Sequence, residues 1–349
     1  MKKEDFCKDV FLDYVAKIGA QDHYLRNNFL PSGYLENLYE ILSSASKVLS
    51  QSKFKNLLDI KLQMKTAEFD EAQFIQNACE LSAMANYLNE RKYLLSYEKK
   101  VTGKKDVDFS LVVENRVFNV EVKCSSYNGR TTKPKVGQIQ ALFLDRAPTN
   151  EMRNAILEQI SRQLGPHGHF ISEEKNLDNV LKDFLLSTQS KVKDASLTDT
   201  NILLICCDDE LDVHQWRHHL LGRNGFLTGN SQCSSDEYNR VDFVLLTNLY
   251  NRQIRPYEGE VCGNHWSLAD AFCLLYPNKL SLRNKDIYDW VKESSKVSDF
   301  FPNHSRNFED YFSNGEVPEG ENLDMKTMCL AVAFFSDNLK KNGRSYFKE

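Results

Sequence analysis

The sequence lacks any apolar run approaching the ~20 residues that a membrane-spanning helix needs. The charged residues 2–5 lead into an amphipathic segment, not into the apolar core of a signal peptide. The nine cysteines are scattered and odd in number, and no Cys-x-x-Cys pair is present. This usage argues against a disulfide framework and for reduced thiols. Together these absences predict a cytoplasmic protein that does not contact a membrane.

Several motifs of nucleotide and acyl chemistry are also missing. There is no Gly-x-x-x-x-Gly-Lys-Ser/Thr loop, no Gly-x-Gly-x-x-Gly fingerprint and no Gly-x-Ser-x-Gly elbow. Any work driven by nucleotide hydrolysis is therefore expected to come from a partner.

What the chain does contain is ordinary for a globular protein. Its 349 residues can hold one large or two ordinary domains, and 41% of them are hydrophobic and 27% charged. Hydrophobic spacing and breaks predict a helical N-terminal region over residues 1–65, a core over residues 66–255 and a helical C-terminal region over residues 256–349. In the last region, 267–275 and 325–339 are the clearest predicted helices.

Charge is unevenly distributed, although the net charge is only −5. Residues 91–162 hold 14 Lys and Arg against 8 Asp and Glu, whereas the rest of the chain holds 30 against 41. A local basic patch on an acidic body fits contacts with a phosphate backbone confined to one cleft. The alternative, favoured for any single lysine, is an ordinary solvated surface side chain.

Residues 106–123 form the most informative stretch. Two alternating apolar runs flank the turn-prone residues 114–116, a pattern that predicts a β-hairpin. Because side chains alternate along a strand, Glu121 and Lys123 project from the same face of the second run. The first run brings Asp108 beside them. Asp106 has the same parity, but Asp108 is preferred because it directly precedes the apolar run 109–112.

Two acids and a lysine that converge in this way suit a divalent metal ion and a phosphate. Hard cations such as Mg²⁺ take oxygen ligands, and Asp108, Glu121 and the Val122 backbone carbonyl would supply them. Lys123 would lie beside the attacking water and the phosphate. The alternative is a half-exposed hairpin on which Glu121 and Lys123 form a surface ion pair worth ~0–1 kcal/mol.

A helix is predicted before the hairpin, from about residue 68 to about residue 92. Thr66 is the expected cap of its start. Glu80 lies beside the buried stripe, and it is either a further metal ligand or a solvated helix residue. The stripe recurs at spacings of three and four and consists of Phe74, Ala78, Leu81, Ala85 and Leu88.

Asp108, followed on the next strand by Glu121-Val122-Lys123, resembles the Asp…Glu-x-Lys signature of the PD-(D/E)XK nuclease superfamily, which has the restriction-endonuclease-like fold. Val107 stands where that signature usually has Pro. The resemblance covers roughly residues 68–250. It implies an α/β fold with a mixed sheet flanked by helices, and it implies that Glu80, on the first helix, is a metal ligand.

The resemblance requires the order helix, hairpin, helix, strand, and the later segments of the chain agree with it. The short apolar runs 201–207 and 241–247 predict buried strands, and a helix is expected near residues 177–186. In the resembled superfamily a Gln or Lys from the next helix can contact the phosphate or water. The residues expected to contact the substrate are Lys104, Lys105, Arg130, Lys133, Lys135 and Gln138.

The residues and the resemblance together predict a Mg²⁺- or Mn²⁺-dependent endonuclease. The resemblance, not the residues, implies DNA as the favoured substrate, and defence against foreign DNA is a context drawn from analogy. Cutting both strands calls for two sites, so a homodimer or a complex with a partner protein is expected. Two alternatives remain open. One is a catalytically idle nuclease fold that binds nucleic acid or acts as a scaffold, and the other is an RNA-cleaving effector.

Overall fold

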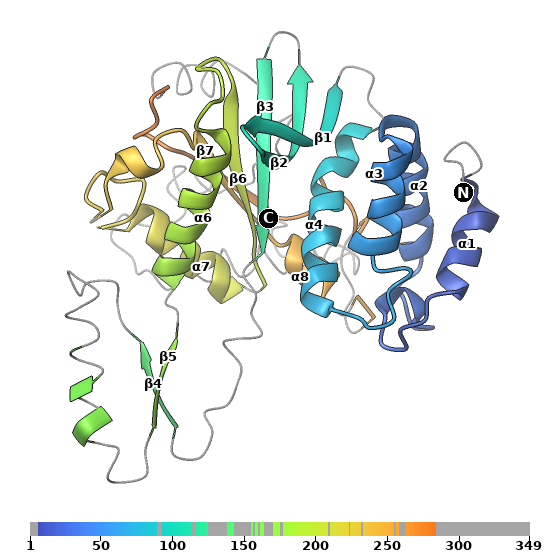
Figure 1. Cartoon of the computed structure of the whole chain (residues 1–349), viewed down its shortest axis with the longest axis horizontal. Helices are drawn as coiled ribbons and strands as arrows, with labels where there is room; N and C mark the ends of the chain where they lie inside the picture. The colour runs from blue at the N-terminus through green and yellow to red at the C-terminus, as the bar shows by residue number, and fades with distance from the viewer. Residues whose placement is uncertain are drawn as a thin grey trace, which may run out of the picture.

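A six-stranded mixed sheet runs through the protein, with helices on both of its faces (Figure 1). The coordinates are a computed structural model. The residues it describes are 6–88, 93–113, 116–124, 138–142, 155, 158–159, 161–163, 170–174, 177–208, 210–222, 224–231, 233–254, 256–257 and 263–283. The strand order in the sheet is β1-β2-β3-β6-β7-β8. The expected α/β class and the mixed sheet flanked by helices are confirmed.

Three consecutive strands form the antiparallel half of the sheet. They are β1 (Leu94–Thr102), β2 (Lys105–Val113) and β3 (Arg116–Cys124). The predicted hairpin is β2–β3, and its register pairs Phe109 with Val120. Alternation explains the pairing, because the apolar side chains of both strands enter one core while the polar ones share the opposite face.

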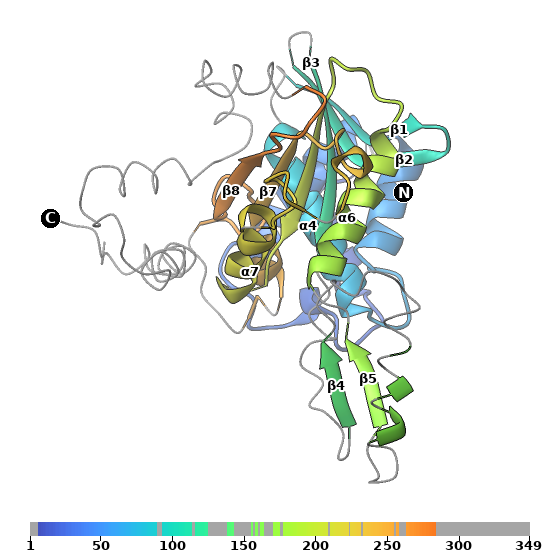
Figure 2. The same cartoon turned by 90° about the vertical axis from the view of Figure 1, so that its left-hand side faces the viewer.

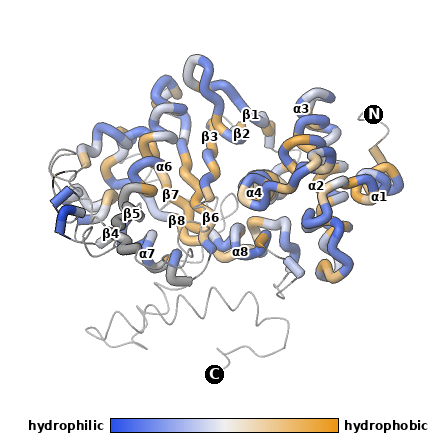
Figure 3. The backbone as a smooth tube through the Cα atoms, turned by 60° about the horizontal axis from the view of Figure 1, so that its bottom comes forward, coloured by the Kyte–Doolittle hydropathy of each residue, from blue (hydrophilic) through white to orange (hydrophobic). Residues whose placement is uncertain are grey.

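The other half of the sheet is more deeply buried. β6 (Thr200–Cys206) lies parallel to β3, and β7 (Phe243–Thr247) lies parallel to β6. Every residue of β6 and β7 is buried, which matches the continuous apolar runs that predicted these strands. Figure 3 shows hydrophobic stretches gathered along these central strands.

The last strand of the sheet corrects a prediction. β8 (Cys273–Pro277) pairs antiparallel with β7, so the helix predicted over residues 267–275 is wrong. A short apolar run fits a buried helix and a buried strand equally well, and only the pairing with β7 decides between them. The sheet thus reaches past residue 255. The helix predicted over residues 325–339 lies outside the described residues.

Helix α4 (Glu71–Leu88) covers one face of the sheet, together with the short α8 (Leu249–Gln253). Asp70 caps α4, since its side chain accepts the Gln73 N–H at 3.0 Å; the prediction of Thr66 as the cap is wrong. Thr66 bonds instead to the Gln63 carbonyl. α4 is buried on most of its surface, not along one stripe, because N-terminal helices pack on its outer side.

Those N-terminal elements share a hydrophobic core with α4 and the sheet. The helical character predicted for residues 1–65 is confirmed over the described part of that region. The elements are α1 (Lys8–Ala16), η2 (Tyr24–Arg26), α2 (Tyr34–Val48), α3 (Gln51–Asn56) and the π-helical turn η3 (Leu57–Lys61).

Helices α6 (Leu177–Val192) and α7 (Glu210–Leu221) cover the opposite face. α6 makes the crossover from β3 to β6, and α7 the crossover from β6 to β7, as parallel strands require. The buried ring of Trp216 anchors α7 to the second core. The helix predicted near residues 177–186 is confirmed and extends to Val192.

Two short strands, β4 (Gln138–Leu142) and β5 (Phe170–Glu174), pair in parallel apart from the main sheet (Figures 1 and 2). The described residues 161–163 are helical, and η6 (Ser235–Glu237) is a further short turn. Within the described part of the chain, no helix is both long enough and apolar enough to cross a membrane.

Candidate functional site

The end of β3 presents a buried carboxylate between two lysines. Glu121 is only 1% exposed, and its Oε1 atom lies 2.7 Å from the Lys123 Nζ atom. The Lys191 Nζ atom, on α6, contacts the same oxygen at 2.6 Å. The alternative of a half-exposed hairpin with a weak surface ion pair is therefore wrong, because the Glu121 carboxylate lies inside the protein.

The other oxygen of this carboxylate is unusual. Among the described residues, Glu121 Oε2 is buried and has no hydrogen-bond partner. Leaving a charged oxygen buried without a partner is costly, so such an atom calls for an explanation such as an absent ion or water.

Asp108 lies just beyond the last β2–β3 pair, where the two strands separate. Its Oδ2 atom accepts the backbone N–H of Val122 at 2.6 Å, which fixes the carboxylate beside the end of β3. The prediction that Asp108 approaches Glu121 is supported by the charge of Glu121 acting on it. Asp106, the competing residue, lies on the same strand, two residues earlier, and its charge acts on Lys191.

α4 brings a third carboxylate to this region. Glu80 is 8% exposed, so it is not a solvated helix residue. Its Oε1 atom accepts from the Gln76 side chain at 3.0 Å, and its Oε2 atom from Lys61 Nζ at 3.2 Å. Gln76 Nε2 also donates to the Val122 carbonyl at 3.1 Å, so this predicted ligand oxygen keeps one further lone pair.

The three carboxylates act on one another. Burial raises the pKa of Asp108 well above its ordinary value, and the charges of Glu80 and Glu121 raise it further. The Val122 N–H and Lys191 oppose this rise without cancelling it. For Lys191, burial lowers the pKa, but Glu121, Asp108 and Asp106 together more than offset it, so the pKa is raised and the side chain stays charged. Burial and the two neighbouring carboxylates therefore favour the protonated form of Asp108 in the metal-free chain.

A divalent metal ion fits this donor set. Hard cations prefer carboxylate and carbonyl oxygens. The Asp108 carboxylate, the Val122 carbonyl and Glu121 Oε2, which has no partner among the described residues, are all of that kind. A cation among them would relieve the repulsion that raises the pKa of Asp108.

The structure describes only some of the residues that are predicted to contact the substrate. Lys104 and Lys105 are exposed at the β1–β2 turn, and Lys105 Nζ bonds to Ser190 at 3.0 Å, next to Lys191. Gln138 is the first residue of β4, and its side chain is outside what the structure describes. Arg130, Lys133 and Lys135 lie outside the described residues.

Lys191, Lys61 and Gln76 were not singled out by the sequence. For Lys191 a signal exists, because it is the basic residue in the last turn of the helix that follows the hairpin. For Gln76 the signal is its spacing, because it precedes Glu80 by one helical turn and so can contact it. Lys61 belongs to an N-terminal turn, and nothing in its local sequence links it to Glu80.

An asparagine at position 108 is expected to stabilise the metal-free chain. An acid whose folded-state pKa is raised destabilises the fold as the pH climbs above its unfolded value, about 3.9. Asp108→Asn removes this cost and keeps an acceptor for the Val122 N–H. The free energy of unfolding at pH 7 should rise by on the order of 1 kcal/mol, with little difference near pH 3. Urea denaturation at both pH values measures this.

The same denaturation is repeated with Mn²⁺. The ion should raise the free energy of unfolding of the wild-type chain by mass action and leave that of Asp108→Asn unchanged. Asp106→Asn is the matched control on the same strand, and it should keep the stabilisation by Mn²⁺. A less stable Asp108→Asn at pH 7, or equal stabilisation by Mn²⁺ in both chains, would contradict this account.

Comparisons of the chain with protein-family models, with curated proteins and with solved structures found no match. The resemblance seen in the sequence therefore remains a prediction, and the geometry of the site carries the functional argument.

Proposed function

We propose that this chain is a metal-dependent endonuclease that hydrolyses phosphodiester bonds, with DNA as the favoured substrate. One observation carries the proposal. A buried carboxylate, Glu121, has one oxygen held by two lysines and the other without a partner among the described residues, beside the raised-pKa carboxyl of Asp108. Unfilled oxygen donors next to paired ammonium groups suit a cation and a phosphate together.

The order of the elements also supports a restriction-endonuclease-like core. A helix, α4, precedes the β2–β3 hairpin, and the crossover helix α6 leads to the strand β6, which is parallel to β3. This is the sequence of elements that the resemblance to the PD-(D/E)XK superfamily implies. The acids come from α4, β2 and β3, as the resemblance also implies.

In this proposal Asp108 and Glu121 hold Mg²⁺ or Mn²⁺, with the Val122 carbonyl as a further oxygen. The resemblance also makes Glu80 a metal ligand, but its two oxygens accept from Gln76 and Lys61. We therefore assign it the third negative charge beside the ion. When bound, such an ion acidifies water and offsets negative charge on the phosphate.

Lys123 and Lys191 have different roles in this proposal. Both ammonium groups rest on Glu121 Oε1 in the free protein. When a phosphate enters, Lys123 turns toward its oxygens and the attacking water, and it stabilises the charge of the transition state. Lys191 stays on Glu121, so the carboxylate does not lose both of its cations. A lysine suits this exchange because its ammonium is a compact charge on a flexible stem.

Lys104 and Lys105 extend positive charge away from the site. They lie on the exposed β1–β2 turn, and Lys105 contacts α6 one residue before Lys191. We assign them to the phosphate backbone, whose contacts position a nucleic acid without reading its sequence. A homodimer, or a partner protein, would supply the second site needed to cut both strands.

Cleavage assays test the function. The full chain is incubated with labelled duplex DNA, single-stranded DNA and RNA, each with Mg²⁺, Mn²⁺ or EDTA. The proposal expects DNA cleavage that needs the metal. Cleavage of RNA alone would favour the RNA-cleaving effector. Binding without cleavage under every condition would favour the catalytically idle fold.

A further inference from the structure

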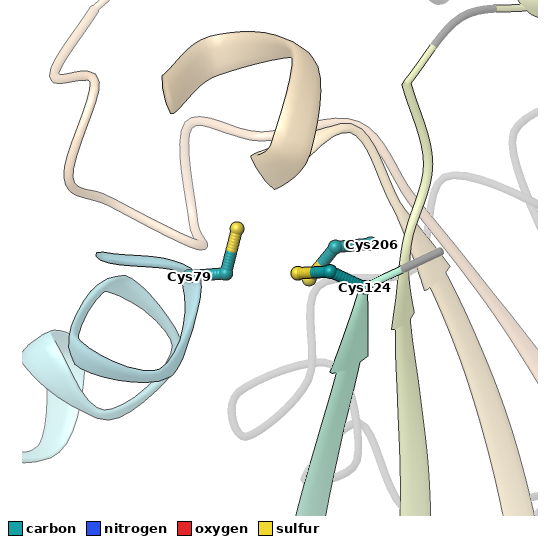
Figure 4. A group of neighbouring side chains, drawn as sticks. All are labelled: Cys79, Cys124 and Cys206. Atoms are coloured by element: carbon teal, nitrogen blue, oxygen red, sulfur yellow. The ribbon is translucent and has the colours of Figure 1, made fainter. Parts of the chain in front are cut away.

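Three cysteines meet directly behind the carboxylate site. Their Sγ atoms, from Cys79, Cys124 and Cys206, all lie within 4.8 Å of one another. Cys79 comes from α4, Cys124 is the last residue of β3 and Cys206 is the last residue of β6. Figure 4 shows Cys124 and Cys206 projecting from adjacent strand ends toward α4.

The fold itself creates this meeting point. Cys124 and Cys206 are register partners in the parallel β3–β6 pair, so their side chains leave the sheet together on one face. That face is the one α4 covers. Cys79 and Cys206 are fully buried, and Cys124 is partly exposed.

The alternative is that the three cysteines act only as small apolar side chains, as buried cysteine often does. Against this, the three Sγ atoms converge from a helix and two strands, and all lie within 4.8 Å of one another. Zinc is held in some proteins by three protein ligands, with a water molecule in the fourth position of the tetrahedron.

We propose that Cys79, Cys124 and Cys206 form a binding site for Zn²⁺. Zn–S bonds are ~2.3 Å long, so three thiolates around a tetrahedral ion stand ~3.8 Å apart, within the spacing observed here. Each thiol that binds gives its proton to solvent, and no oxidant or reductant is required. The soft sulfur donors separate this site from the carboxylates, which prefer Mg²⁺ or Mn²⁺.

Bound Zn²⁺ would join α4 to β3 and β6. Cys79 directly precedes Glu80, and Cys124 directly follows Lys123, so the ion would fix the spacing between the helix and the strand that carry the candidate nuclease site. This zinc site rests on the sulfur geometry and does not depend on the proposed nuclease function.

Co²⁺ serves as the probe, because thiolate ligation gives it an intense near-ultraviolet absorption. The reduced, metal-free full chain is titrated with Co²⁺ and then with Zn²⁺. We expect the thiolate band to saturate at about one Co²⁺ per chain, to be displaced by Zn²⁺ and to survive millimolar Mg²⁺. Cys124→Ala should weaken Co²⁺ binding at least tenfold. Cys233→Ala, at another partly buried cysteine, is the matched control and should bind like wild type.

Two outcomes overturn the proposal, namely no thiolate band in the wild-type chain, or an undiminished band in Cys124→Ala. If circular dichroism shows that Cys124→Ala does not fold, Cys79→Ser is titrated in its place. Glu121→Gln separates the two sites, because it should keep the thiolate band even though it removes the carboxylate that the nuclease proposal needs.

Discussion

Glu121→Gln is expected to abolish metal-dependent cleavage, with a loss of about 10³-fold or more in the cleavage rate constant. The substitution keeps the size of the side chain and removes its charge. The Oε2 atom that has no partner among the described residues would no longer be a carboxylate oxygen for the metal ion. Lys123 and Lys191 would also share a neutral group in place of an anion.

A matched control distinguishes the loss of this site from a general loss of negative charge. Glu98→Gln neutralises a partly buried carboxylate on β1 that pairs with Lys61 at 3.0 Å and has no contact with Glu121 among those described. Its cleavage rate should stay within a few fold of wild type. Circular dichroism verifies that both variants fold. Wild-type cleavage by Glu121→Gln would rule out this carboxylate as the metal ligand.

Lys123→Met is expected to lower the cleavage rate constant by about 10²–10³-fold, the usual cost of removing one preorganised group that stabilises transition-state charge. The methionine keeps the aliphatic stem and loses the ammonium. Mn²⁺ binding should change little, because Lys123 is not a metal ligand and Lys191 still compensates Glu121. Single-turnover cleavage at saturating Mn²⁺, together with calorimetric titration, separates the two effects.

Lys191→Met provides the comparison. Its ammonium lies at nearly the same distance from Glu121 Oε1, yet the proposal makes it a positioning residue that holds the carboxylate. The loss in cleavage should be smaller than for Lys123→Met, and Mn²⁺ binding should change more. Equal losses in both variants, with equal Mn²⁺ binding, would contradict the division of work between the two lysines.

Local patterns in the sequence predict much of the sheet. The hairpin β2–β3 and the buried strands β6 and β7 follow from alternation and from short apolar runs, which are properties of neighbouring residues. The same alternation places Glu121 and Lys123 on one face, which the 2.7 Å contact confirms. Periodicity also predicts α4, although not its burial on the side that the N-terminal helices cover.

Features that depend on contacts between distant segments of the chain cannot be predicted from local sequence patterns. β8 is a strand because it completes an edge of the sheet beside β7, and its own residues fit either structure. Lys191 reaches Glu121 only because α6 crosses over the sheet. The cysteine cluster depends on the register that sets Cys124 beside Cys206, and in the sequence its members look scattered.

The most direct test of the central claim is calorimetric titration of Mn²⁺ into the metal-free chain, wild type beside Glu121→Gln. The account predicts that wild type binds at least one Mn²⁺ through Asp108 and Glu121, and that Glu121→Gln loses this binding while staying folded. Absence of Mn²⁺ binding in wild type, or identical binding in the two chains, would contradict a metal-dependent nuclease at this site.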